Sequence, residues 1–191
     1  MRGFYWYFMP GLKTGNYFNH TRSLPAFFWD TQTNMNCMRQ CIKETKANAY
    51  AHHIQRLMVI GNYALLTQVD PSEVDAWYLG VYIDAIEWVE ITNTRGMSQF
   101  ADGGIIATKP YVSSANYINK MGNYCKACFY NVNTKIGEKA CPFNSLYWNF
   151  LHAKQCPPIV YSSILRQGRS AERGAGALSG REGGMDDIVC D

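Results

Sequence analysis

Three features are absent from this 191-residue sequence: a long hydrophobic run, a secretion signal and sustained alternation of polar and apolar residues. No stretch reaches the roughly 18 consecutive apolar residues of a membrane-spanning helix, so we expect no membrane association. The aromatic start, residues 1–13, is interrupted by Pro10 and Gly11 and does not resemble a signal peptide. Seven cysteines, an odd number without an export signal, favour ligand or free-thiol roles in a reducing compartment, which predicts a cytoplasmic protein.

Charge is also scarce. Charged residues make up 17% of the chain and the formal net charge is +3, too little by itself to indicate a nucleic-acid partner. The apolar content of 47% excludes an acidic disordered chain and a flexible linker protein. Because neither strand-type alternation nor a glycine-rich phosphate loop is present, the sequence predicts a mainly α fold.

Composition divides the chain near Cys156. Residues 1–155 carry 26 of the 27 aromatic residues. Residues 156–191 are rich in glycine, and Tyr161 is their single aromatic residue. This contrast predicts one domain over 1–155 and a tail over 156–191 that is either disordered or frame-shifted. Ten aromatic residues lie within residues 1–30, a density typical of a core, so we expect the chain to be a fragment of a longer protein.

Apolar spacing and capping signals predict the helices. Asp70-Pro71-Ser72-Glu73 is typical of a helix start, with a capping aspartate, proline at the first helical position and glutamate three residues after the cap. The helix it opens is expected to run through Val81 and Ile83 toward Trp88. Further helices are predicted over 35–46, 49–66, 113–121 and 142–154.

The cysteines form a metal-ligand pattern. Cys125 and Cys128 are three residues apart, and Cys141 follows after twelve further residues. Such spacing can direct several thiolates to one structural zinc ion or one iron–sulfur cluster, and the spacing does not decide between them. The alternative is that the cysteines pack as buried free thiols. The candidates for a fourth ligand are Cys37, Cys41, Cys156 and His152.

Histidine, aromatic and acidic residues form a second candidate set. His52 and His53 adjoin on a predicted helix and point roughly 100° apart, so they do not form a bidentate metal pair. The aromatic residues are either core packing or carriers of a transient radical, and the acidic stretch is either a solvated face or a contact to a polar cofactor. The residues concerned are Trp29, Trp77, Tyr78, Trp88, Tyr111 and Tyr117, with Asp84, Glu87 and Glu90.

Two strings are specific to a known family. They are YAHHIQRLM at residues 50–58, and the CxxC motif at 125–128 followed by CPFN at 141–144. Trp29, Cys37, AWY at 76–78, EWVE at 87–90, ADGG at 101–104 and KPY at 109–111 occur in the matching order. From about residue 2 to about residue 153, the sequence resembles the iron–sulfur bacterial cryptochromes and photolyases, which include prokaryotic (6-4) photolyases.

The resemblance implies an incomplete helical FAD-binding domain with a [4Fe–4S] cluster. It places Glu90 near the reactive edge of the flavin and Asp84 against the ring system. The implied cluster ligands are Cys37, Cys125, Cys128 and Cys141. The implied electron-transfer chain is Trp29, Trp77 and Tyr78, and the implied pocket for the damaged base contains His53, Tyr111 and Tyr117. An antenna chromophore would belong to an upstream domain that this sequence does not contain.

The resemblance also implies an activity: light-driven repair of UV-damaged DNA, of the (6-4) photoproduct type, by a monomeric protein that transfers an electron from FAD. We expect the 191-residue chain to be inactive alone because its flavin pocket is incomplete. Two alternatives stay open: a blue-light photoreceptor cryptochrome without repair activity, and a metal-stabilised helical interaction module.

Overall fold

The computed structural model describes residues 2–154, which are mainly helical, as predicted. The predicted tail over 156–191 lies outside the described residues. Within them, β structure is confined to two isolated bridges, Arg22 with Val69 and Asn131 with Ala140. The helices are α1 (Arg2–Phe8), α2 (Gly11–Thr14), α3 (Phe27–Asp30), α4 (Asn36–Asn48), α5 (His53–Gln55), α6 (Asn62–Leu66), α7 (Pro71–Val81), α8 (Glu87–Glu90), α9 (Ala115–Met121) and α10 (Pro142–Ala153). Two π-helical segments, η1 (Arg56–Gly61) and η2 (Ile91–Ser98), and a 3₁₀ segment, η3 (Tyr124–Ala127), complete the set.

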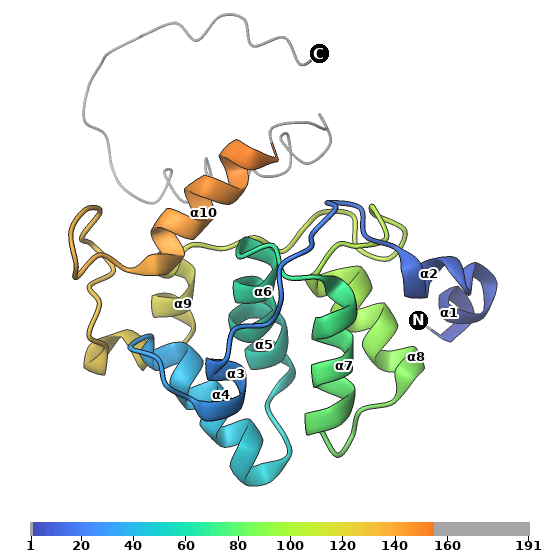
Figure 1. The fold of residues 1–191 in the computed structure, drawn as a ribbon, viewed down its shortest axis with the longest axis horizontal. Helices are drawn as coiled ribbons and strands as arrows, with labels where there is room; N and C mark the ends of the chain where they lie inside the picture. The colour runs from blue at the N-terminus through green and yellow to red at the C-terminus, as the bar shows by residue number, and fades with distance from the viewer. Residues whose placement is uncertain (1, 155–191) are drawn as a thin grey trace, which may run out of the picture.

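The segment from α5 through η1 to α6 forms the centre of the molecule. Figure 1 shows it flanked by α7 and α8 on one side and by α9 on the other, with α10 projecting from the top. Every residue from Leu57 to Leu66 is buried. A helix that is apolar on all sides is stable only when it is surrounded, and here α4, η2 and α10 pack against it.

Two predicted helix boundaries were wrong. The helix expected over 49–66 begins only at His53, and the helix expected to continue toward Trp88 ends at Val81. The early end of α7 has a tertiary cause. Ala49 adopts a left-handed conformation (φ 50°) that ends α4, and its carbonyl accepts a hydrogen bond from the Ile83 amide at 2.9 Å. Because the Ile83 amide is used in this way, α7 does not continue past Val81.

The predicted cap of α7 is confirmed, but its capping box is not formed. The Asp70 carboxylate accepts a hydrogen bond from the Ser72 amide at 2.7 Å, and Pro71 occupies the first helical position. The Glu73 carboxylate does not return to Asp70. It accepts the Leu24 amide at 2.6 Å, so the glutamate fastens an earlier segment of the chain to the start of α7.

The early aromatic residues divide between core and surface. Phe18 and Phe28 are buried, as the aromatic density predicts. Trp6 and Tyr7, in contrast, are 70% and 81% exposed on α1. The hydroxyl of Tyr5 donates a hydrogen bond to the Glu87 carboxylate at 2.9 Å, which fastens α1 to the start of α8.

Candidate functional site

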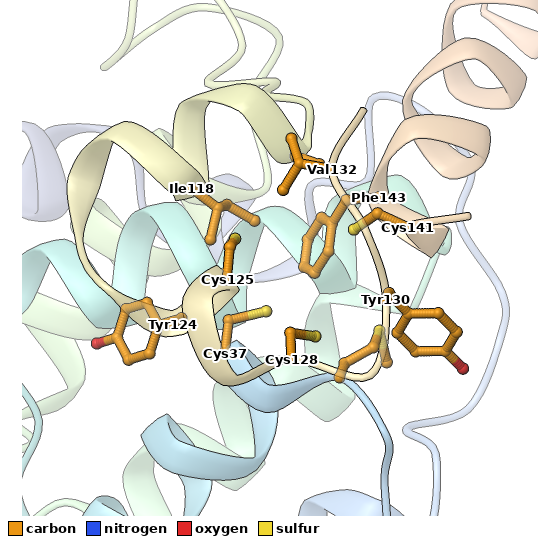
Figure 2. Close-up of a pocket in the computed structure, with 11 residues that line it drawn as sticks. Cys37, Ile118, Tyr124, Cys125, Cys128, Tyr130, Val132, Cys141 and Phe143 are labelled. Carbon is orange, nitrogen blue, oxygen red and sulfur yellow. The ribbon is translucent and has the colours of Figure 1, made fainter. Parts of the chain in front are cut away.

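Four cysteines from distant parts of the chain line one small pocket (Figure 2). Cys37 lies in the first turn of α4, Cys125 lies in η3 and Cys128 directly follows it, while Cys141 immediately precedes α10. These are the four residues for which the family resemblance implies a ligand role. The rest of the lining is apolar or aromatic: Met35, Ala115, Ile118, Tyr124, Tyr130, Val132 and Phe143.

Local hydrogen bonds hold the cysteine-bearing segments together. The Asn36 side chain, next to Cys37, donates to the backbone carbonyl of Tyr124 at 2.8 Å across a separation of 88 residues. The Cys128 thiol donates to the carbonyl of Asn34 at 3.7 Å. Both contacts bind the segment around η3 to the start of α4, which explains how sequence-distant cysteines come to share one pocket.

Burial in apolar surroundings raises the pKa of three of the pocket thiols, Cys37, Cys125 and Cys141. The pKa of Cys125 rises to about 11. Within residues 2–154, no group of three or more His, Cys, Asp or Glu side chains converges on a single ion position. One zinc ion would need its sulfur ligands about 2.3 Å from a common point. A four-iron cluster instead takes one thiolate at each iron, so its four thiolates lie farther apart than those around a single ion.

The other candidates for a fourth ligand lie elsewhere. Cys41, one helical turn after Cys37, is fully buried outside the pocket lining, and its thiol donates to the Tyr124 hydroxyl at 3.7 Å. His152 is exposed on α10, and Cys156 lies outside the described residues.

A second pocket is lined by three of the other predicted site residues: His53, Tyr78 and Glu90. It lies where the two π-helical segments meet α7 and α8. Such segments are rare and are frequent at functional sites. The remaining lining residues are Arg56, Leu57, Val89, Asn93, Thr94 and Ser98.

Arg56 is the centre of this pocket, and the sequence reasoning did not select it. Its Nη2 atom donates to both carboxylate oxygens of Asp84, at 2.8 and 3.0 Å, and its Nη1 atom lies 3.8 Å from Glu90 Oε1. The Tyr78 hydroxyl donates to the backbone carbonyl of Arg56 at 2.7 Å, and the Arg56 guanidinium lies over the Tyr82 ring, 3.9 Å from its centre. The sequence feature that could have indicated Arg56 is its position, as a single arginine directly before the mainly apolar run 57–66. Asp84 and Glu90 thus meet through a shared cation.

Glu90 is a buried carboxylate in a mixed environment. Burial raises its pKa, while a 2.6 Å hydrogen bond from the Thr94 hydroxyl and the charge of Arg56 oppose that rise. Asp84, the other carboxylate paired with Arg56, is exposed and lies outside the pocket lining. The pocket itself combines the buried Glu90 carboxylate and the Arg56 guanidinium with the apolar side chains of Leu57 and Val89.

The predicted electron-transfer residues are only partly brought together. Trp77 is buried, and its ring centre lies 5.5 Å from that of Tyr78 and 5.2 Å from that of Phe28. Trp29, next to Phe28 in α3, is 58% exposed, and no aromatic ring contact of Trp29 occurs within residues 2–154. The rings of Trp77 and Tyr78 are therefore in contact, whereas Trp29 is exposed and its neighbour Phe28 contacts Trp77.

Tyr111 and Tyr117 do not line the Arg56 pocket. Tyr111 packs partly buried against the core in the loop before α9, and Tyr117 is 37% exposed on α9 itself. Of the three residues assigned to the damaged-base pocket, only His53 lies at the pocket that the structure forms.

No helix between residues 2 and 154 is both long and apolar enough to cross a membrane.

Comparison with known proteins identifies the family. No family model matches the chain. The chain is 58% identical over 151 residues to the (6-4) photolyase of Agrobacterium fabrum strain C58, a match covering 79% of this chain and 30% of that protein. It is also 37% identical over 95 residues to the uncharacterized protein R855 of Acanthamoeba polyphaga mimivirus, covering 50% of this chain and 70% of that protein. The chain thus spans about a third of the photolyase it matches. From this identity and the helical fold, the chain belongs to the photolyase family.

Proposed function

We propose that the chain carries part of the flavin- and DNA-binding machinery of a light-driven (6-4) photolyase. The observation that carries this proposal is the Arg56 pocket, because His53, Tyr78 and Glu90 line it together with Arg56 in a chain 58% identical to a (6-4) photolyase. UV-damaged DNA is then the substrate, with the lesion flipped out of the duplex before repair.

The pocket lining offers both apolar and polar groups to an FAD ring system. Leu57 and Val89 offer apolar contact to a ring face, while Arg56 and Glu90 offer a donor and an acceptor to a polar ring edge. Bound FAD would supply the electron for repair. The Arg56–Asp84 pair would fix the orientation of the ring, since a guanidinium bonded to both carboxylate oxygens has little freedom.

His53 is suited to proton transfer. It lies at the rim of the same pocket and is exposed, so it can exchange protons with solvent and present one to a bound lesion. Tyr78 lines the pocket and its ring contacts that of Trp77, so this pair would carry an electron to the flavin. The other residues given a role by the resemblance lie outside the lining of this pocket: Tyr111, Tyr117 and Trp29.

We further propose that Cys37, Cys125, Cys128 and Cys141 hold a [4Fe–4S] cluster. Support comes from four thiols, brought together from three segments of the chain, that line one apolar pocket. Its role would be structural, since the ligands join α4 to the segment 125–141 and ligation contributes directly to folding free energy.

The deciding experiment is iron, sulfide and flavin analysis with a UV–visible spectrum on anaerobically purified chain. We expect about four iron and four sulfide per chain for a [4Fe–4S] cluster. Cys37→Ser should lose most of the iron, whereas Cys41→Ser, a matched change one turn later on the same helix, should retain it. Zinc, or equal iron in both variants, would contradict the cluster assignment.

The same samples separate the alternative functions. Iron without flavin would favour the metal-stabilised interaction module. Flavin that is reduced by light, in a protein that repairs no lesion, would favour a photoreceptor. The proton-donor role of His53 is tested by His53→Ala in a repair-active photolyase that contains this segment: lost repair with unchanged DNA binding supports the role, and full repair removes it.

A further inference from the structure

Tyr124 belongs to the cysteine pocket but reaches beyond it. It immediately precedes Cys125 and lines the pocket, and its backbone carbonyl is held by Asn36 beside Cys37. Figure 2 shows its ring turned away from the cysteine sulfurs. The hydroxyl at the far end of the ring accepts a hydrogen bond from Gln55 Nε2 at 3.0 Å.

Gln55 uses every polar atom of its side chain. Its Nε2 atom also donates to Glu44 at 2.9 Å, and its Oε1 atom accepts the backbone amide of His52 at 2.8 Å. The His52 ring in turn accepts the Ile54 amide at 3.2 Å, which completes a reciprocal cap at the start of α5. Gln55 therefore fixes the first turn of α5.

That first turn carries two residues of the Arg56 pocket. His53 lies two positions before Gln55, and Arg56 is the residue directly after it. Asp84 holds the Arg56 guanidinium and Tyr78 donates to the Arg56 backbone carbonyl, so a shift of the turn would change these Arg56 contacts. A continuous path thus runs from Cys125 through the Tyr124 hydroxyl and the Gln55 amide to His53 and Arg56.

We propose that the Tyr124–Gln55 hydrogen bond couples the two pockets, so that the state of the four cysteines sets the position of His53 and Arg56. Gln55 is then a positioning residue of the Arg56 pocket. The functional meaning of the coupling rests on the function proposed above, but the link itself is a property of the chain. Ordering of the loop around Cys125 holds the Tyr124 hydroxyl in place, and loosening of that loop releases the cap of α5.

The test is backbone hydrogen exchange in the full chain with Tyr124→Phe, which removes one hydroxyl and leaves the ring. The amides of residues 54, 55 and 56 each donate to His52 and report on the capped turn. We expect them to exchange about fivefold faster, the change that corresponds to one net hydrogen bond. Tyr130→Phe is the matched control, because Tyr130 lines the same pocket and its hydroxyl has no hydrogen bond within residues 2–154.

Loading of the cysteines gives the second comparison. In the wild-type chain, reconstitution with iron and sulfide should slow exchange at residues 54–56, and Tyr124→Phe should abolish that response while keeping protection near Cys125. Equal exchange at 54–56 in the Tyr124→Phe and Tyr130→Phe chains, or an undiminished response to loading in Tyr124→Phe, would overturn the coupling. If the chain retains no iron, the cluster proposal fails, and the comparison of the two variants in the thiol form still decides the link.

Discussion

Gly61 of η1 lies directly against Ser98 of η2, and a Cβ atom built on Gly61 would overlap the Ser98 hydroxyl oxygen. The backbone carbonyl of Arg56 is also close to that position, and the Gly61 carbonyl accepts a hydrogen bond from Gln99. The absence of a side chain therefore allows the two π-helical segments to meet behind the Arg56 pocket.

Gly61→Ala should destabilise the chain although alanine favours helices. We expect a loss of about 1–3 kcal/mol in the free energy of unfolding, since the added methyl group must displace η2. Gly80→Ala is the control, because Gly80 is helical and a Cβ there meets nothing within 4 Å. Gly80→Ala should gain about 0.5–1 kcal/mol. Urea unfolding of both variants tests the pair, and equal effects would contradict close packing at Gly61.

Loss of Arg95, which is in a buried ion pair, should lower the free energy of unfolding far more than loss of Lys13, which is in an exposed ion pair. The Arg95 guanidinium lies 2.6 Å from the Asp75 carboxylate, both are buried, and it also donates to the Gly15 carbonyl and the Ser72 hydroxyl. Arg95→Leu leaves a buried carboxylate without its cation, which costs about 3–5 kcal/mol. Lys13→Leu breaks an exposed pair with Glu87 and should cost less than about 1 kcal/mol. Denaturant midpoints compare them, and similar losses would contradict the prediction.

His20 should make the fold sensitive to acid. Burial, helped by nearby Lys154 and Arg22, lowers its pKa to about 4. Between pH 6.5 and 4 the unfolded chain binds a proton that the folded chain excludes, so stability falls as the pH falls, by at most about 1.4 kcal/mol per pH unit. His20→Phe should flatten this dependence, measured by unfolding at several pH values. His152→Phe, at an exposed position on α10, should leave it unchanged; an unaltered slope in His20→Phe would refute the assignment.

Glu90→Ala should alter the rate at which light reduces bound flavin. Glu90 is buried in the Arg56 pocket, and its removal takes away one of the two carboxylates that pair with Arg56 within residues 2–154 and leaves the more exposed one, Asp84. Glu87→Ala provides the control, because Glu87 lies three residues earlier and faces Tyr5 and Lys13 at the surface. The rate is followed by flavin absorbance under blue light. An unchanged rate in Glu90→Ala would remove Glu90 from the flavin site.

The sequence predicts elements that depend on local signals and misses those set by tertiary contacts. The Asp70 cap, the Pro142 helix start and the close spacing of Cys125 and Cys128 are all local, and each is present in the structure. The end of α7 depends on a hydrogen bond from Ile83 to Ala49, which no local pattern reveals.

The candidate sites show the same division. Spacing alone could not choose between Cys37 and Cys41, since the choice depends on which face of α4 meets η3; the family resemblance selected Cys37, and the structure brings it to the pocket. The role of Arg56 was missed because its partners, Asp84 and Glu90, lie about thirty residues later and meet it only after η1 and η2 pack together.

The separation of 88 residues between the Asn36 and Tyr124 contact partners, each adjacent to a predicted ligand, has a thermodynamic consequence. A centre ligated by Cys37 and Cys125 would close a loop of that size, much as a disulfide does, and so would reduce the conformational entropy of the unfolded chain. Because the closed loop contains α5 to α9, those helices could not separate fully while the centre remained intact. Loss of the centre would therefore lower the free energy of unfolding of the domain.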